Sequence, residues 1–256
     1  MTSLAELKER RAHECRLRPD RALATLDEAE EFLRDRGLLT RTTDSALPSL
    51  FEACHEEPYA GESPGFGQWP ATKFPWFGQL GARGHLSVAV HRSKSLLVTD
   101  EVAALLDPIC RAELERMAAT EKGWARLLEH LADAGPSELE DLQTELTLTP
   151  KELKSLRSPL ERCGAVVARP LVYEKPHRHT SLLLRWDQAH PKASGASDPR
   201  RALGDLLCVG TRAAVVAPER ELARWFSWRR YWDDALVDQL VESGQLVRVD
   251  GHVASG

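Results

Sequence analysis

The sequence predicts an α+β fold, mostly α-helical, made of tandem winged helix-turn-helix units. Three observations predict this fold class. Short amphipathic helices follow one another in groups of three, with Gly or Pro at their ends. Each group is followed by two short apolar strands around a polar turn. The same order of helices and strands occurs in the middle of the chain and again near its C-terminal end.

The middle unit, residues 123–190, shows the pattern most clearly. Its first helix is GWARLLEHLADAGP, whose leucines share one face. A second helix is predicted to open at Ser137, because Glu140 stands at the capping-box position. Thr149 and Pro150 start a third helix, with Pro at its first position. The segments AVVARPLV and TSLLLRW are the predicted strands, and the turn YEKPHRH between them is the predicted wing.

The C-terminal unit, residues 198–256, repeats this order. Its predicted helices are DPRRALGDLLCVG, APERELARWFSW and DDALVDQLVESG. A small hairpin, QLVRVDGHVAS, follows them. We expect it to turn at Asp250-Gly251, because this dipeptide favours two-residue hairpin loops.

The N-terminal region, residues 1–122, is less regular. A helix is predicted over 26–39, a second is possible over 46–56, and a hairpin is predicted over 85–100. Between them, residues 65–80 read GFGQWPATKFPWFGQL and hold five of the 16 aromatic residues of the chain. We expect a winged-helix-like region that carries an aromatic loop insertion.

This aromatic stretch has two interpretations. Trp69, Trp76 and Phe77 could stack on a base or wedge into a duplex, with Lys73 as a polar head among the rings. The same rings could instead pack as a core plug or between domains, where a buried Trp needs a partner for its N–H group. The sequence leaves both interpretations open.

Charge is distributed unevenly. The net charge of −5 lacks the overall basic field of a nonspecific nucleic-acid binder. However, residues 150–186 hold eight basic and three acidic groups, whereas residues 101–149 hold four and eleven. In a DNA-binding winged helix, the third helix enters the major groove and the wing contacts the backbone. The candidate DNA contacts here are Lys151, Lys154, Arg157, Arg162, Lys175, His177, Arg178 and His179. Their alternative role is the solvated face of an amphipathic helix.

A second aromatic cluster, WFSWRRYW, occupies residues 225–232. Arg229 and Arg230 could clamp phosphates while the neighbouring rings stack on bases. A packed turn with arginines lying on aromatic faces is the alternative.

Other chemistry has no motif. The five cysteines are scattered, without a C-x-x-C pair or zinc-ligand spacing, so we expect reduced thiols, no metal site and no cofactor. No apolar run approaches ~18 residues, and the N-terminus is charged throughout. We therefore expect a cytoplasmic protein without a membrane partner, located at the nucleoid if it binds DNA.

The last part of the chain resembles a known family. Residues 211–251 are similar to the C-terminal winged helix of the AlkZ/YcaQ-like bacterial DNA glycosylases, which are tandem winged-helix proteins that remove alkylated bases. The matching positions are Ala223, Arg224, Trp225, Leu246, Val247, Val249 and Gly251. The resemblance implies a DNA-binding protein that acts on damaged or modified bases.

The family's catalytic signature, Gln-x-Gln or Gln-x-Asp, is absent. Every glutamine of the chain is isolated, so no catalytic residue can be assigned. Asp44, Glu52 and Glu56 are candidate general bases by position near the aromatic stretch. Two other hypotheses stay open: a non-catalytic DNA-binding regulator, and a protein–protein scaffold, which the net charge of −5 and the acidic segment 101–149 favour.

Overall fold

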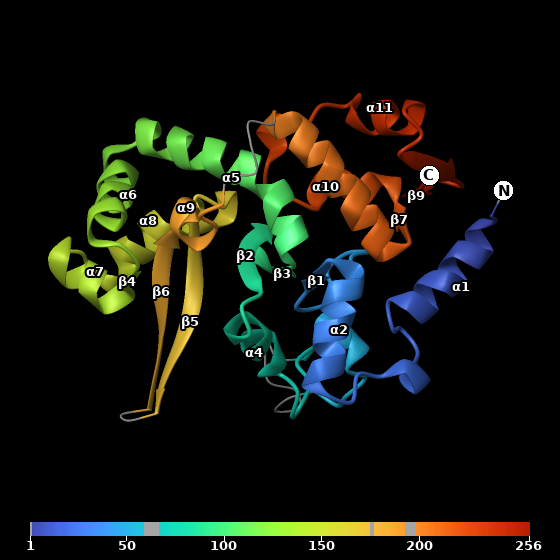
Figure 1. Cartoon of the computed structure of the whole chain (residues 1–256), viewed down its shortest axis with the longest axis horizontal. Helices are drawn as coiled ribbons and strands as arrows, with labels where there is room; N and C mark the ends of the chain where they lie inside the picture. The colour runs from blue at the N-terminus through green and yellow to red at the C-terminus, as the bar shows by residue number, and fades with distance from the viewer. Residues whose placement is uncertain (1, 59–66, 175–176, 193–197) are drawn as a thin grey trace.

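The fold is α+β and mostly helical, with three small antiparallel sheets, as the sequence predicts (Figure 1). This computed structural model describes residues 2–58, 67–174, 177–192 and 198–256, without the side chains of residues 172–174 and 177–179. Within these ranges, no helix is both long and apolar enough to cross a membrane.

The three sheets share one strand order, in which the last strand of a hairpin lies between its partner and a short earlier strand. The N-terminal sheet consists of β1 (Leu38–Thr40), β3 (Lys94–Val98) and β2 (Leu86–His91), in that order. The middle sheet consists of β4 (Ser137–Glu138), β6 (His177–Arg185) and β5 (Val166–Glu174). The C-terminal sheet consists of β7 (Val216–Pro218), β9 (His252–Ser255) and β8 (Leu246–Val249).

Of the two helices expected in the N-terminal region, one is shorter in the structure. The N-terminal helices are α1 (Leu4–Glu14), α2 (Leu26–Arg36), α3 (Leu50–Ala53) and α4 (Trp76–Ala82), with a 3-10 turn, η1 (Pro19–Arg21). The predicted stop of the helix in 26–39 near Gly37 is confirmed: α2 ends at Arg36, and Gly37 takes φ 79° and donates to the carbonyl of Leu33. The possible helix over 46–56 shrinks to α3, since the carbonyl of Pro48 accepts a bond from β1 instead.

In the middle of the chain, the helices are α6 (Lys122–Ala134), α7 (Leu139–Glu145), α8 (Pro150–Cys163) and α9 (Trp186–Ala189). The predicted start of α8 is confirmed: Thr149 and Glu152 form a capping box, and the Glu152 carboxylate accepts from the Thr149 N–H at 2.8 Å. The predicted helix start at Ser137 is wrong. Ser137 lies in β4, and its hydroxyl donates to the carbonyl of Gly135 at 2.9 Å, so it is not free to cap a helix.

The C-terminal helices are α10 (Pro199–Ala214) and α11 (Leu236–Glu242), separated by two 3-10 turns, η2 (Glu219–Arg224) and η3 (Arg229–Tyr231). The second predicted helix is therefore a 3-10 turn. The hairpin turn at Asp250-Gly251 is confirmed, because both residues have positive φ, 48° and 71°.

A long helix that the sequence analysis did not identify, α5 (Asp100–Thr120), joins the parts of the molecule. It follows β3 and packs against α6, α8, α9 and α10 (Figure 1). One core cluster contains Leu96, Leu106, Val167, Leu207 and Trp225, which come from all three predicted units. Because this core is shared, the division into residues 1–122, 123–190 and 198–256 remains a proposal.

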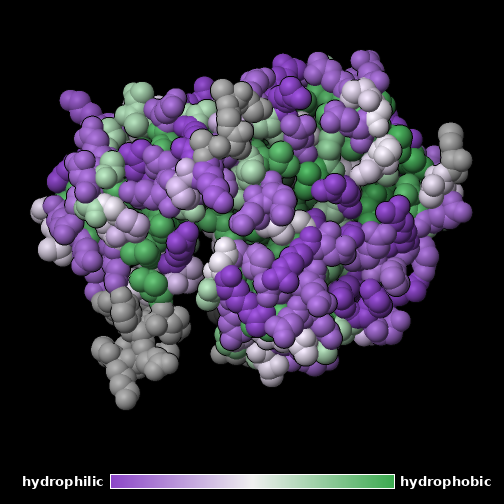
Figure 2. Space-filling model, viewed as in Figure 1, coloured by the Kyte–Doolittle hydropathy of each residue, from purple (hydrophilic) through white to green (hydrophobic). Residues whose placement is uncertain are grey.

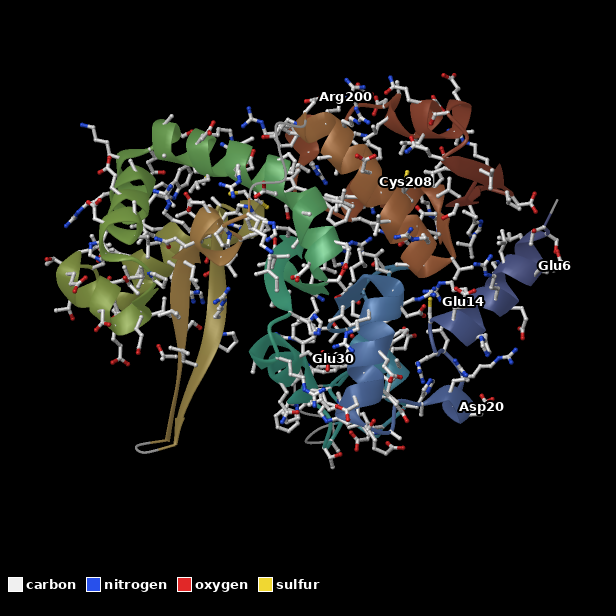
Figure 3. All side chains as sticks on the ribbon, viewed as in Figure 1. Glu6, Glu14, Asp20, Glu30, Arg200 and Cys208 are labelled. Carbon is white, nitrogen blue, oxygen red and sulfur yellow. The ribbon has the colours of Figure 1, made fainter. Side chains whose placement is uncertain are left out.

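The surface in view is largely hydrophilic, and a notch lies between the described part of the β5–β6 hairpin and the N-terminal region (Figure 2). A hollow of about 500 Å³ lies there, between the glycines of α4 and strand β5. Exposed carboxylates such as Glu6 and Asp20 extend from the outside of the molecule (Figure 3).

Candidate functional site

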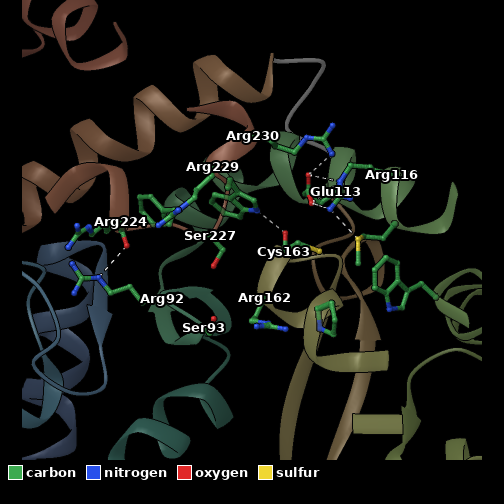
Figure 4. Close-up of a pocket in the computed structure, with 15 residues that line it drawn as sticks. Arg92, Ser93, Glu113, Arg116, Arg162, Cys163, Arg224, Ser227, Arg229 and Arg230 are labelled. Carbon is green, nitrogen blue, oxygen red and sulfur yellow. Dashed lines mark hydrogen bonds and ion pairs between the residues drawn. The ribbon is translucent and has the colours of Figure 1, made fainter. Parts of the chain in front are cut away.

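An arginine-lined cavity lies where the N-terminal, middle and C-terminal parts of the chain meet (Figure 4). We call it the central pocket. Its volume is about 750 Å³, enough for a nucleotide-sized group. Among its lining residues, six are arginines and one is acidic, Glu113, so the lining is strongly positive. The arginines are Arg92, Arg116, Arg162, Arg224, Arg229 and Arg230.

Five different elements bring these arginines together. Arg92 is in the turn between β2 and β3, Arg116 is on α5, and Arg162 is in the last turn of α8. Arg224 ends η2, and η3 carries Arg229 and Arg230. Arg224, Arg229 and Arg230 lie close together in the sequence, whereas Arg92, Arg116 and Arg162 come from distant segments, so the pocket exists only in the folded chain.

The turn between β2 and β3 stands at the edge of the central pocket. Arg92 and Ser93 have φ values of 49° and 63°, and His91 pairs with Lys94 across the hairpin. This is the left-handed two-residue loop that matches the twist of the strands, although neither residue is Gly, Asn or Asp. Such backbone strain is often found at functional sites.

Arg92 ties this turn to the C-terminal part of the chain. Its Nε donates to the carbonyl of Arg224 at 3.2 Å, and its Nη1 donates to the carbonyl of Asp44. A further hollow of about 410 Å³ is lined by Arg92, Arg224, Arg220 and Glu221. The basic surface therefore continues from the central pocket around the β2–β3 turn.

Buried aromatic rings form the floor of the central pocket. Trp228 is 3% exposed, stacks on Phe226 with ring centroids 5.7 Å apart, and donates from Nε1 to the carbonyl of Cys163 at 2.8 Å. This contact joins η3 to the end of α8. Because Trp228 is fixed, the next two residues, Arg229 and Arg230, are exposed at the rim.

The one carboxylate of the central pocket, Glu113, is fully engaged. It is 2% exposed, and it accepts from Arg116 Nη2 at 2.5 Å and from the Tyr231 hydroxyl at 2.9 Å. Burial, and then the hydrogen bond to Glu113, raise the pKa of Tyr231 to about 12. The hydrogen bonds that Arg116 donates to Glu113 also raise the pKa of Arg116. At neutral pH, Tyr231 is therefore a neutral donor and Arg116 a fixed cation.

A second cavity, which we call the side pocket, adjoins the central pocket at Ser93. Its volume is about 560 Å³, and its lining includes Arg41, Asp44, Trp69 and Lys94. The guanidinium of Arg41 lies 5.4 Å from the ring centroid of Trp69 and 4.6 Å from that of Phe77. Burial lowers the pKa of Arg41, and its Nε has no hydrogen-bond partner among the described residues. A flat polar group would find both stacking surface and donors here.

The aromatic stretch is mostly core packing. Phe77 is 4% exposed and contacts Phe51 edge-on at 6.4 Å, so its ring lies in the core rather than on the surface. Trp69 is half-buried and also packs edge-on against Phe51, at 5.6 Å. Trp76 is half-buried on the same core. Of these rings, Trp69 lines the side pocket.

Lys73 has a structural position. Its Nζ donates to the carbonyl of Leu23 at 2.7 Å and to that of Cys54 at 3.5 Å, and it lies 5.4 Å from the ring centroid of Trp76. The lysine thus joins the loop before α4 to the rest of the N-terminal core. Because its ammonium group donates to these carbonyls, the charge of Lys73 points into the protein and not toward solvent.

The basic residues of the third helix separate into two groups. Arg162 lines the central pocket. Lys151 and Lys154 are exposed nearer the other end of α8, about 12–17 Å away by helical rise. Arg157 forms an ion pair with Glu161 and does not reach the pocket. Lys175 and the side chains of His177, Arg178 and His179 lie outside the described residues.

The candidate general bases differ in their surroundings. Asp44 lines the side pocket and pairs with Lys94. Burial raises the pKa of Glu56, but the hydrogen bonds from Thr72 and from the N–H of Lys73 outweigh this and lower it overall. Glu52 lines neither pocket. In the described ranges, no group of three or more His, Cys, Asp or Glu side chains could hold a metal ion.

Sequence reasoning missed Arg92, Arg116 and Glu113. A signal for Arg92 existed in the length of the hairpin, because HRSK leaves only two residues for its turn. Arg116 and Glu113 had no such signal, since α5 itself was not identified. Arg224 was noticed only as part of the Ala-Arg-Trp segment.

A solved structure with a similar fold is the Streptomyces sahachiroi DNA glycosylase AlkZ. The TM-score is 0.61, the match covers 99% of this chain and 69% of that chain, and the sequence identity is 14%. No family model and no curated protein sequence matches the chain. At this identity the likeness shows the fold. The resemblance expected from the last part of the sequence thus extends, at the level of the fold, along almost the whole chain.

Proposed function

We propose that this chain binds duplex DNA and that the central pocket holds the phosphate backbone. The observation that carries the proposal is the convergence of six arginines, from five elements, on one cavity with a single acidic residue. Guanidinium groups are suited to phosphate because they present a planar fork of donors. The AlkZ-like fold supports the proposal, since that protein is a DNA glycosylase.

The negative net charge is compatible with this function. Each phosphate neutralised by an arginine releases condensed counterions, so a local cluster of cations is sufficient for binding. Lys151, Lys154 and the wing would add contacts along the duplex beyond the central pocket. With DNA as the partner, we expect the protein in the cytoplasm, at the nucleoid.

A finer proposal is that the protein acts on damaged or modified bases. An extruded base would enter the side pocket, whose volume of about 560 Å³ suits a nucleobase and whose wall includes Trp69 and Arg41. Asp44 is the carboxylate of the side pocket and the candidate general base. The Gln-x-Gln signature is absent, so excision by this chain needs its own assay for abasic sites.

The test is a salt titration of binding to two fluorescent duplexes, one plain and one with an alkylated base. Contacts to four to six phosphates predict a slope of log affinity against log salt of about −4 to −5. Replacing Arg224 and Arg229 with Gln should make this slope less negative by about 2 and weaken binding at least tenfold.

Arg126→Gln is the matched control, because Arg126 is exposed on α6 and does not line the central pocket. The control should bind like the wild type. Absence of binding by the wild-type chain at about 50 mM salt contradicts the proposal and favours a protein partner. Equal binding to the two duplexes keeps DNA binding but contradicts the role in base damage.

A further inference from the structure

Glu113 is an unusual residue for a cavity that binds an anion. Its carboxylate is buried in a lining whose other charged groups are all arginines, and a negative charge there repels phosphate. Burying a carboxylate also carries a desolvation cost that only well-placed partners can offset.

The contacts of Glu113 join two distant segments. On its own helix α5, Arg116 donates to it from Nη2 at 2.5 Å and from Nε at 3.1 and 3.2 Å. From η3, 118 residues away along the chain, the Tyr231 hydroxyl donates to it at 2.9 Å. Arg230, also on η3, places Nη1 at 3.7 Å from the same carboxylate oxygen (Figure 4).

These contacts fix the directions of two pocket arginines. Arg116 is one-third exposed and Arg230 about half exposed, so without Glu113 both long side chains would sample many rotamers. With Glu113 in place, both guanidinium groups are held at one wall. A pre-positioned pair loses less conformational entropy on binding than a free pair.

We infer that Glu113 is a positioning residue, which orients Arg116 and Arg230 to receive neighbouring phosphates of one DNA strand. The inference rests on the proposed function. The carboxylate itself does not contact DNA. Glu113 acts through the two arginines and holds η3 against α5.

The test is Glu113→Gln, because positioning and simple charge predict opposite signs. If Glu113 only repels phosphate, the amide should bind a plain duplex more tightly, with an unchanged or steeper salt slope. If it positions the arginines, we expect about tenfold weaker binding, with a salt slope less negative by about 1 to 2. Glu115→Gln is the control. Glu115 is exposed on the same helix, and this substitution removes the same negative charge.

A second variant keeps the test decisive if Glu113→Gln fails to fold. Tyr231→Phe removes one donor to Glu113 without changing any charge, and we expect about threefold weaker binding with a thermal midpoint near that of the wild type. A thermodynamic cycle tests whether the effect of Glu113→Gln on affinity acts through Arg116 and Arg230. In a chain that already carries Arg116→Gln and Arg230→Gln, Glu113→Gln should have no further effect on affinity.

The outcomes separate the two proposals. Tighter binding by Glu113→Gln, or full affinity of Tyr231→Phe, overturns the positioning role while DNA binding stands. Failure of the wild-type chain to bind any duplex overturns the proposed function itself.

Discussion

Phe77→Ala is expected to lower the free energy of unfolding by about 3–5 kcal/mol, the range for removing a buried aromatic side chain. Phe77 is 4% exposed and belongs to the core cluster that includes Phe32, Leu50 and Leu80. Deleting its ring would leave a cavity next to Phe51 and remove the surface on which Arg41 lies. Urea unfolding followed by tryptophan fluorescence measures the change.

The matched variant is Trp76→Ala, at the preceding position of α4. Trp76 is only half-buried, so its loss should cost clearly less than the loss of Phe77. Both variants should retain DNA affinity at a temperature where they are folded, since neither ring lines the central or the side pocket. An unchanged unfolding midpoint for Phe77→Ala, together with lost DNA binding, would show that the ring contacts DNA and that the core assignment is wrong.

The aromatic stretch shows which structural features the local sequence predicts and which it does not. Its composition correctly marked a structured segment, but the choice between core and site depended on which face each ring turns to the rest of the chain. Phe77 follows Trp76 by one position, and on a helix such neighbours point in different directions. The helix α4 that sets these directions was hidden by the glycines at positions 78 and 81.

Local signals predicted the elements whose stability is local. The Thr149–Glu152 capping box and the Asp250-Gly251 turn depend on residues within four positions of each other, and the structure has both. Ser137 satisfied the same capping pattern but joined a strand, because pairing with Leu183 of β6 uses contacts that the pattern does not include. Tertiary pairing overrode a local preference there.

The central pocket could not be predicted in the same way. Three of its arginines lie within residues 224–230, but Arg92, Arg116 and Arg162 come from distant positions. Their proximity depends on the packing of α5 against α8 and α10. Basic clustering along the sequence instead selected α8 as a whole, of which Arg162 lines the pocket and Lys151 does not. A run of basic residues in the sequence identifies the charged face of one helix. A site built from several elements can be predicted only when the relative positions of those elements are known.

His91 leads to the second large prediction, a loss of stability in mild acid. It is 0% exposed at the end of β2, its Nε2 lies 3.3 Å from the hydroxyl of Ser45, and its Nδ1 has no partner among the described residues. Burial lowers the pKa of His91 to about 4, and the nearby Arg92 and Lys94 act in the same direction. The backbone of Trp225, which is the largest influence after burial, and the carboxylate of Asp44 oppose the shift, but burial outweighs them.

The sign of the pH dependence follows from this lowered pKa. In the unfolded chain, His91 takes up a proton below pH ~6.5, whereas in the folded chain it stays neutral down to pH about 4. The full stability is therefore present above pH ~6.5 and is lost as the pH falls from there toward 4, by about 3 kcal/mol in total. Urea unfolding at a series of pH values between these limits measures the loss.

His91→Gln should remove this component and give a flatter pH profile, because glutamine cannot be protonated in this range. The difference between the two profiles isolates His91, because half-buried carboxylates such as Glu14, whose pKa is also lowered, reduce the stability of both proteins equally in acid. His13→Gln is the control, as His13 is exposed on α1 and should leave the profile unchanged. Parallel profiles for the wild type and His91→Gln would mean that His91 already accepts a proton in the folded chain. In that case the β2 end beside the central pocket would be open to water, and the turn that carries Arg92 would move more freely than its contacts indicate.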